Sequence, residues 1–368
     1  MASTDTNTYA PDYAVHPGEI LDETLFARGI KKADFAERCG LTAKTVSQII
    51  NGKAPVTPET AIQFERVLGV SADVWNNLEA FYRLYEAKIV ARKKLEDQKA
   101  WADRFPVKEL VRRELIKKPA NAVEKVEGLL NFFAVGSITA WEKRFRRMSI
   151  AYRRSPSYKI APESVATWLR IGELIAETID TMPYNKVAFK TVLREIRRLT
   201  NKPPDVFEPR MKDLCRKAGV AVVFVSELPG THLSGATRWL NKDKALIMQS
   251  LRHKRDDHFW FTFFHEAGHI LHHGKKEVFI DEGDIKLSSR KEEKEVNRFA
   301  ANFLIPEDKY KRFLDNTDRF SKKTVSDFAA DMGIAPGIVV GRLQFDKIIP
   351  YSWLNGLTRK FVICESKT

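Results

Sequence analysis

Two segments in the C-terminal half of the chain place metal-binding side chain types at spacings that suit one ion. The first reads FTFFHEAGHILHH over residues 261–273, and its His265 and His269 lie four residues apart. On a helix this spacing projects both imidazoles from one face. A hydrolytic zinc site uses three protein ligands and leaves the fourth position to water. Because Glu266 adjoins the first histidine, we expect it to act as the general base for that water.

The second segment, SSRKEEKEVNRFAANFLIP, offers the third ligand. Its apolar residues recur at helical spacing and form one stripe, made by Val296, Phe299, Ala300 and Phe303. Glu293 lies on the inward edge of this stripe and is the expected third ligand, with Glu295 as the alternative. Asn297, one turn after Glu293, is expected to hydrogen-bond a ligand. His272 and His273 fall on other helical faces, so a loop or solvated role is expected for them.

Either segment alone is also compatible with buried histidines on an ordinary amphipathic helix, but the pair argues against that interpretation. Together they resemble the ImmA/IrrE family of zinc metallopeptidases, whose motif is HExxH followed by ExxAnxFAxxLLxP, over about residues 210–310. Val296 replaces the usual alanine. The resemblance implies a zincin-like α+β fold, zinc ligands His265, His269 and Glu293, and Glu266 as general base. It also implies a protein substrate, a repressor or an antitoxin.

Other elements must position these segments. A helix from Met211, a turn at Gly219 and a β-branched strand over Val220–Val225 are expected before them. The stretch SGATRWLNKDKALIMQSL predicts a hairpin whose returning strand is ALIMQS. Residues 201–207, NKPPDVF, are expected to form a boundary loop. The charged stretch 86–118 predicts a long exposed linker helix that is interrupted by prolines.

The first ninety residues carry a different signal. The segments KKADFAERCG and LTAKTVSQIINGK predict two short helices with the layout of a helix-turn-helix. Ala36 is small where two helices would cross, Gly40 permits a sharp turn, and Val46 would pack the second helix on the core. Thr42 is its expected N-cap.

If that apolar stripe is buried, the polar residues of the second helix face outward. Thr45 and Gln48 can hydrogen-bond base edges, whereas Lys44 and Lys53 suit phosphates. Residues 14–90 resemble the Xre-type helix-turn-helix of HigA-like antitoxins. The resemblance implies double-stranded operator DNA bound as a homodimer, and it makes a toxin a further partner.

Composition limits the remaining possibilities. The 368-residue chain has a formal net charge of +14, which favours polyanionic partners, nucleic acid first among them. Its three cysteines, Cys39, Cys215 and Cys364, are widely spaced and fit reduced cytosolic thiols. No apolar run reaches the roughly 18 residues of a membrane span, and the N-terminus lacks a secretory signal pattern. We therefore expect a cytoplasmic protein with no membrane partner.

These observations predict a multidomain chain. A flexible tail (1–13) precedes an all-α helix-turn-helix domain (14–90), a helical linker or middle region (91–204) and an α+β zinc metallopeptidase-like domain (205–368). The leading hypothesis is a DNA-binding transcriptional regulator with a zinc-dependent endopeptidase that cleaves a repressor or antitoxin. The alternative is an antitoxin-like repressor whose C-terminal domain is a non-catalytic sensor.

Overall fold

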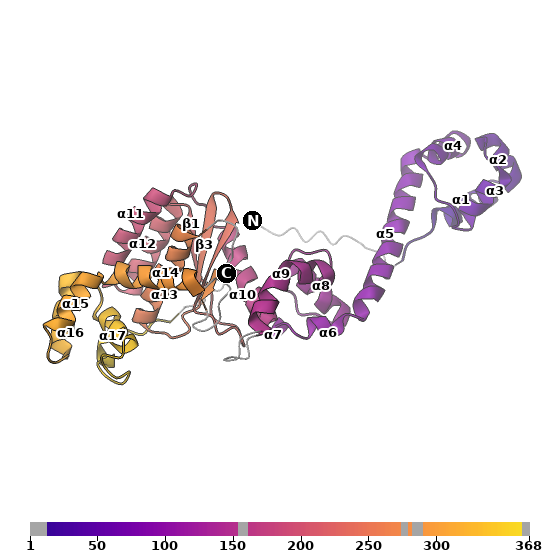
Figure 1. The fold of residues 1–368 in the computed structure, drawn as a ribbon. Coiled ribbons are helices and arrows are strands. Elements are labelled where there is room, and N and C mark those ends of the chain that lie inside the picture. Colours follow the sequence, from indigo (N-terminus) through magenta and orange to yellow (C-terminus); the bar gives the residue numbers. More distant parts are fainter. Residues whose placement is uncertain (1–12, 154–160, 274–278, 282–289, 363–368) are drawn as a thin grey trace. The chain divides into compact units, whose positions relative to one another are not determined.

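The structure is a computed structural model that describes residues 13–153, 161–273, 279–281 and 290–362 (Figure 1). The chain divides into two compact units, Met1–Lys99 (unit 1) and Ala100–Thr368 (unit 2). Helices dominate both units, and the described strands form one small sheet in unit 2. The chain is therefore multidomain, with an all-α N-terminal part and an α+β C-terminal part.

Unit 1 contains five helices in its described residues: α1 (Pro17–Ala27), α2 (Lys32–Cys39), α3 (Ala43–Ile50), α4 (Pro58–Leu68) and α5 (Ala72–Glu96). Local chemistry sets their starts, because the side chains of Thr42, Thr57 and Ser71 cap α3, α4 and α5 by accepting backbone N–H bonds. The expected long helix over 86–118 is wrong in its extent. Helix α5 ends at Glu96, and the rest of this stretch contains only two short helices, Lys99–Ala102 and Val107–Arg112.

The core of unit 1 is built around aromatic contacts. Phe64 lies between Phe35 and Trp75, with ring centroids 5.1 and 5.5 Å away, and all three side chains are buried. Such edge and tilted contacts are favourable for aromatic rings. This core fixes α2 and α3 against α4 and α5.

Unit 2 combines a helical N-terminal portion with an α+β portion. Its helices are α6 (Lys99–Ala102, across the boundary), α7 (Val107–Arg112), α8 (Ala122–Phe132), α9 (Ile138–Arg153), α10 (Pro162–Glu177), α11 (Lys186–Arg198), α12 (Pro204–Lys217), α13 (Asp256–His272), α14 (Arg290–Leu304), α15 (Glu307–Asp315), α16 (Lys322–Met332) and α17 (Pro336–Phe345), followed by a 3-10 turn (Asn355–Leu357). The expected loop over 201–207 is wrong in its second half. Helix α12 already begins at Pro204, since proline suits the first position of a helix.

The four-stranded sheet of unit 2 has the order β1-β3-β2-β4, and Figure 1 labels two of its strands, β1 and β3. Its strands are β1 (Val220–Phe224), β2 (Gly235–Asn241), β3 (Lys244–Gln249) and β4 (Phe279–Asp281). Strand β3 pairs antiparallel with β2 and parallel with β1, and β4 pairs antiparallel with β2. The predicted strand after Gly219 and the predicted hairpin are both confirmed.

Alternate residues of the central strands point to opposite faces of the sheet. On one face, Met248 of β3 lies so close to Gly172 of α10 that a methyl group on this glycine would collide with it. On the other face, Val222 and Ile247 join the core that contains α12 and α13. Helix α13, which carries the candidate ligands His265 and His269, therefore lies on the sheet, opposite α10.

Two further expectations concern composition. Among the described residues, no helix combines the length and the apolar character that crossing a membrane requires. Cys39 and Cys215 are buried free thiols, and burial raises the pKa of Cys39 to about 11 and raises that of Cys215 as well. Cys364 lies outside the described residues.

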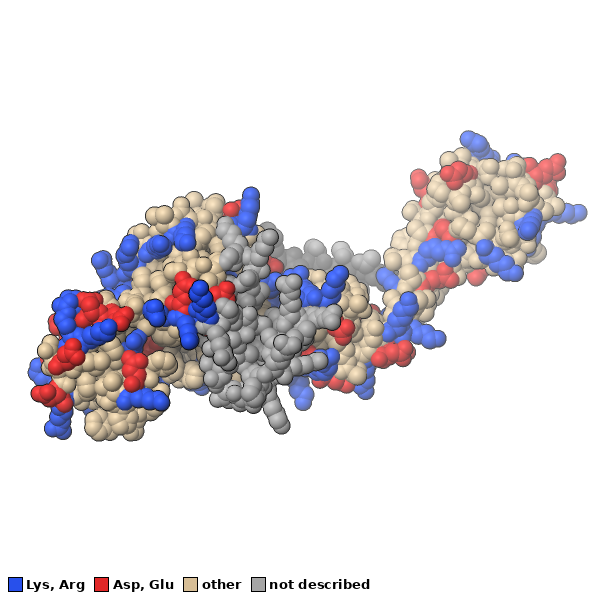
Figure 2. Space-filling view, in the orientation of Figure 1, with Lys and Arg blue, Asp and Glu red and all other residues tan. Residues whose placement is uncertain are grey.

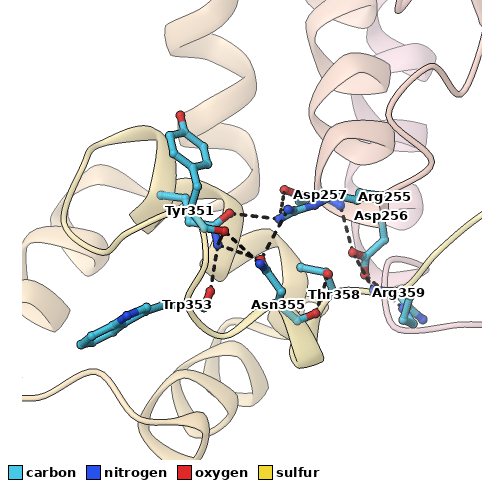
Figure 3. Close-up of polar contacts among 9 residues, drawn as sticks. Arg255, Asp256, Asp257, Tyr351, Trp353, Asn355, Thr358 and Arg359 are labelled. Carbon is cyan, nitrogen blue, oxygen red and sulfur yellow. Dashed lines mark hydrogen bonds and ion pairs between the residues drawn. The ribbon is translucent and has the colours of Figure 1, made fainter.

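The start of α13 is fastened by the C-terminal segment (Figure 3). Asp256 is fully buried; its carboxylate accepts the backbone N–H of Asp257 at 3.0 Å and the Nε–H of Arg359 at 3.1 Å. The Arg359 guanidinium also donates to backbone carbonyls of residues 200–202. Gly337 of α17 touches the Asp256 carboxylate where no Cβ would fit. Three segments distant in sequence thus meet at one buried charge.

We expect Arg359→Ala to destabilise unit 2 by about 3 kcal/mol, because it leaves the Asp256 carboxylate buried without its ion-pair partner. For a unit of this size the melting temperature should fall by roughly 5–10 °C. Calorimetry of the full chain measures this, with Lys360→Ala, an exposed neighbour, as the control. Equal melting temperatures for the two variants would contradict this role of the ion pair.

Candidate metal centre and DNA-contact helix

Helices α13 and α14 carry the candidate metal ligands and pack against each other. Helix α13 is buried over most of its length, with Phe263, Phe264 and Ala267 in the core of unit 2. Gly268 lies where the two helices approach closely. A Cβ there would lie 3.0 Å from Phe299 Cδ1 and 3.2 Å from the Val296 Cβ. A small residue at 268 therefore allows both helices to bring their polar side chains together.

His265, His269 and Glu293 converge in a buried cluster. Their exposed fractions are 1, 0 and 7 %. The two histidine Nε2 atoms are 3.1 Å apart, and each lies 3.5 Å from a different carboxylate oxygen of Glu293. Among the described residues, these three form the group whose donor atoms could hold a metal ion, all within 4.8 Å of one another.

This arrangement fits zinc. Ligand atoms bound at 2.0–2.2 Å to one tetrahedral ion lie about 3.3–3.6 Å apart, close to the three distances in the cluster. Zinc also requires neutral imidazole. Burial, followed by the neighbouring His265 and His273, lowers the pKa of His269 to about 2, so this ring is uncharged near neutral pH. Two imidazoles and one carboxylate are a donor set found in zinc hydrolases.

The second ring nitrogens of the two histidines have partners that orient them. His265 Nδ1 lies 2.9 Å from Asn297 Oδ1, which matches the hydrogen bond expected for Asn297. His269 Nδ1 lies 3.1 Å from His273 Nδ1. His273 lies just after the helix and outside the cluster, as expected, but its ring also contacts a candidate ligand. This ring is turned back toward His269, the candidate ligand one helical turn earlier.

Glu295, the alternative third ligand, points elsewhere. Its carboxylate lies 3.3 Å from His272 Nδ1, and its side chain is half exposed. Burial lowers the pKa of His272, with the Glu295 carboxylate opposing that effect. The structure thus brings Glu293 to the two histidines and leaves Glu295 outside the cluster.

Glu266 is fully buried beside the cluster and is held by strand β2. The Thr237 hydroxyl is 2.6 Å from Glu266 Oε2 and 3.0 Å from its backbone carbonyl oxygen. A Cβ on Gly235 would lie 2.7 Å from Glu266 Oε1, so glycine makes room for the carboxylate. The sequence did not predict a role for Thr237, because only the packing of β2 on α13 brings its hydroxyl to this carboxylate.

In unit 1 the helix-turn-helix segments adopt the expected local structure. Gly40 ends α2 in the left-handed conformation, with φ of 68°. Ala36, Val46 and Ile49 are buried in the core of unit 1. The turn between α2 and α3 and the buried face of α3 therefore match the expectation.

The four predicted DNA-contact residues lie on or just after α3. Lys44 and Lys53 are exposed, and Thr45 and Gln48 are half-buried. The Thr45 hydroxyl lies 2.8 Å from the hydroxyl of Thr42, the N-cap residue. A base contact from Thr45 would therefore compete with this local hydrogen bond, whereas no side-chain hydrogen bond among the described residues restricts Lys44 or Gln48.

The fold and the site define a two-part class of protein: a helix-turn-helix regulator joined to a peptidase-like α+β unit. Residues 25–75 match the family model described as Helix-turn-helix, and residues 222–344 match the peptidase family model described as IrrE N-terminal-like domain. Both resemblances noted from the sequence motifs are thereby confirmed.

Curated relatives agree with the first match. The HTH-type transcriptional regulator YddM of Escherichia coli strain K12 is 36 % identical over 72 residues, which are 20 % of this chain and 77 % of YddM. The Virulence-associated protein I of Dichelobacter nodosus is 30 % identical over 76 residues, 20 % of this chain and 70 % of that protein. The chain belongs to the family of helix-turn-helix transcriptional regulators and carries an IrrE-like peptidase domain.

Solved structures that are similar to the N-terminal part include two members described as antitoxin or antidote proteins. One is the Pseudomonas aeruginosa antitoxin HigA with the higBA promoter, which is 34 % identical; the match covers 23 % of this chain and 94 % of that one, with a TM-score of 0.22. Another is an addiction module antidote protein of a HigA family from Coxiella burnetii, which is 30 % identical; the match covers 23 % of this chain and 91 % of that one, with a TM-score of 0.21.

Proposed function

We propose that unit 1 binds operator DNA through α3 and so regulates transcription in the cytoplasm, where that DNA lies. The observation that carries this proposal is the pairing of a buried stripe on α3 with outward-facing Lys44 and Gln48, behind an αL turn at Gly40. Such a helix fits the major groove, where a glutamine side chain distinguishes base edges. The 36 % identity to an HTH-type regulator supports the same function.

Selection of bound duplexes from a random pool, using the full chain, would identify the operator. We then expect Gln48→Ala to weaken operator binding by about 1–3 kcal/mol and to relax the base preference at one position. Lys53→Ala should weaken all sequences alike and reduce the salt dependence. If Gln48→Ala keeps the wild-type affinity and base preference, α3 does not read this operator through Gln48.

Operator binding as a homodimer extends this proposal. Helix α5 exposes Phe81 and Leu84, with exposed fractions of 69 and 51 %. A second copy of the same helix would cover these side chains, and a two-fold dimer matches a palindromic operator. Light scattering of the wild type and of Phe81→Glu would show a dimer and a monomer, respectively, if α5 forms the interface.

For unit 2 we propose a zinc-dependent endopeptidase. His265, His269 and Glu293 would hold the ion, supported by Asn297 and His273. Zinc held by such ligands supplies Lewis acidity for attack by water on a carbonyl group. Glu266 would accept the proton of that water and deliver it to the leaving amine.

The natural substrate in this proposal is a repressor or an antitoxin, and a toxin would be a further partner. The observation that favours an enzyme over a sensor is the carboxylate of Glu266. A structural metal site needs no base beside its ligands, yet Glu266 directly follows the candidate ligand His265, and the Thr237 hydroxyl holds its buried carboxylate. Cleavage of a repressor by the wild type, and not by Glu266→Gln, tests the proposal. A chain that binds DNA and zinc but cleaves nothing would instead be a repressor with a sensor domain.

A further inference from the structure

The positive charge of the chain belongs to unit 2. Residues 1–99 hold 13 of the 62 Lys and Arg and 14 of the 48 Asp and Glu, which leaves 49 and 34 for residues 100–368. Unit 1 is therefore close to neutral, and the formal excess of positive charge lies in the unit with the metal centre. A polyanion attracted by this charge would therefore bind to a basic surface of unit 2.

Helix α11 offers such a surface, which we call the α11 ridge: Lys186, Lys190, Arg194 and Arg198. These residues recur every four positions and are all exposed. The opposite side of the helix is buried through Phe189, Leu193 and Ile196. Figure 2 shows Lys and Arg side chains gathered over the region of α11 and α12. Within the part of the chain that the structure describes, no carboxylate forms an ion pair with any ridge residue.

The neighbouring helix α12 is also basic, but its basic side chains are neutralised. Its four basic side chains each have an acidic partner within 4.0 Å: Arg210 with Glu195, Lys212 with Glu208, and Arg216 and Lys217 with Asp213. This contrast shows that the α11 ridge is more than a consequence of general surface composition.

The α11 ridge also opposes the stability of its own helix. Like charges at i and i+4 repel each other along a helix. Lys186 is moreover the first residue of α11, where the helix dipole favours an anion over a cation. A bound polyanion would relieve both effects. Since helix formation does not account for the ridge, its arrangement suits an external ligand.

We propose that the α11 ridge binds the phosphate backbone of duplex DNA without reading its sequence. The row is about 18 Å long at 1.5 Å per residue. One DNA strand carries about five phosphates over that length. Lys and Arg donate charge-assisted hydrogen bonds to phosphate oxygens. DNA is favoured over an acidic protein because unit 1 would hold DNA at high local concentration; this step rests on the proposed operator binding.

The test is fluorescence anisotropy of the full chain with a labelled duplex of arbitrary sequence, over a series of salt concentrations. The ridge variant carries Lys186→Gln, Lys190→Gln, Arg194→Gln and Arg198→Gln, since glutamine favours helix. The control carries Arg210→Gln, Lys212→Gln, Arg216→Gln and Lys217→Gln on α12 and removes the same charge. We expect the ridge variant to lose about tenfold or more in affinity at low salt. The slope of its log K against log salt is negative, and the magnitude of this slope should be smaller than that of the wild type by about 2–4. The control should stay within about twofold of the wild type.

Three outcomes would overturn the proposal. The ridge variant could bind the duplex as tightly as the wild type, or both variants could lose equal affinity for it. The ridge variant could also keep its affinity for the duplex and lose affinity only for polyglutamate, used as a model acidic polypeptide. Circular dichroism checks the fold. If the fourfold variant does not fold, Lys190→Gln with Arg194→Gln should give about half the change in slope. The two proposals are separated by titrating the wild type and the ridge variant with both the selected operator and the arbitrary duplex, because the ridge variant should lose affinity for both duplexes and keep its base preference for the operator. Failure of operator binding alone would then leave the ridge result standing.

Discussion

Glu293→Ala should remove zinc from the purified chain, whereas Glu295→Ala should leave about one zinc ion per chain. The Glu293 carboxylate lies 3.5 Å from Nε2 of both His265 and His269, and it is buried. Glu295 is half exposed and pairs with His272 instead. Loss of a direct ligand should lower zinc affinity by more than about 100-fold, the upper end of the losses known for supporting residues.

Plasma mass spectrometry gives the zinc content, and competition with a chelator gives the affinity. His269→Ala should behave like Glu293→Ala. Asn297→Ala and His273→Ala should retain zinc but bind it about 10–100-fold more weakly, because each orients one imidazole. Zinc that survives Glu293→Ala would point to Glu295 or to another ligand set. A wild type without zinc, even after reconstitution, would favour a non-enzymatic DNA-binding regulator.

Glu266→Gln should keep zinc but cleave peptides about 10²–10⁴-fold more slowly, which is the range attributed to general acid–base catalysis. The amide has nearly the shape of the carboxylate but cannot accept the proton of the attacking water. Thr237→Val should lower the rate as well, because it removes the hydroxyl that holds Glu266 Oε2 at 2.6 Å. Thr237→Ser keeps that hydroxyl and should restore most of the rate.

The measurement is intact-mass analysis of helix-turn-helix repressors, including the chain itself, after incubation with each zinc-loaded variant. Circular dichroism and zinc content serve as controls, since a misfolded chain would also fail to cleave. Persistent cleavage by Glu266→Gln at the wild-type rate would exclude Glu266 as the base. Slow cleavage by Thr237→Ser, at the rate of Thr237→Val, would assign Thr237 a packing role instead of a positioning role.

Much of the helix pattern could be predicted from local sequence. Side-chain caps at Thr42, Thr57 and Ser71 and the αL turn at Gly40 depend on neighbouring residues, so unit 1 followed the expected layout. The expected long helix over 86–118 was wrong because a run of charged helix formers does not mark where a helix ends. Tertiary packing decides such boundaries, and here α5 ends at Glu96.

The candidate site divides in the same way. The sequence by itself determined that His265, Glu266 and His269 share one helix, because a spacing of four residues fixes the faces of a helix. Glu293 and Glu295 point about 200° apart on a helix, so periodicity favoured Glu293, on the inward edge of the apolar stripe. Periodicity could not show that this edge faces His265 and His269. The close packing of Val296 on Gly268 sets the rotation of α14, and this rotation brings Glu293 inward.

Contacts between segments that are distant in the chain could not be predicted from the sequence. The Thr237 hydroxyl meets Glu266 only through the register of β2. The basic side chains of α12 pair with Glu195, Glu208 and Asp213, whereas the α11 ridge has no ion pair among the described residues. The sequence thus determined the chemistry that each helix can present, since that depends on residues within two turns. Only the tertiary structure decided which of these groups meet, because strand register and helix rotation are set by the packing of the whole core.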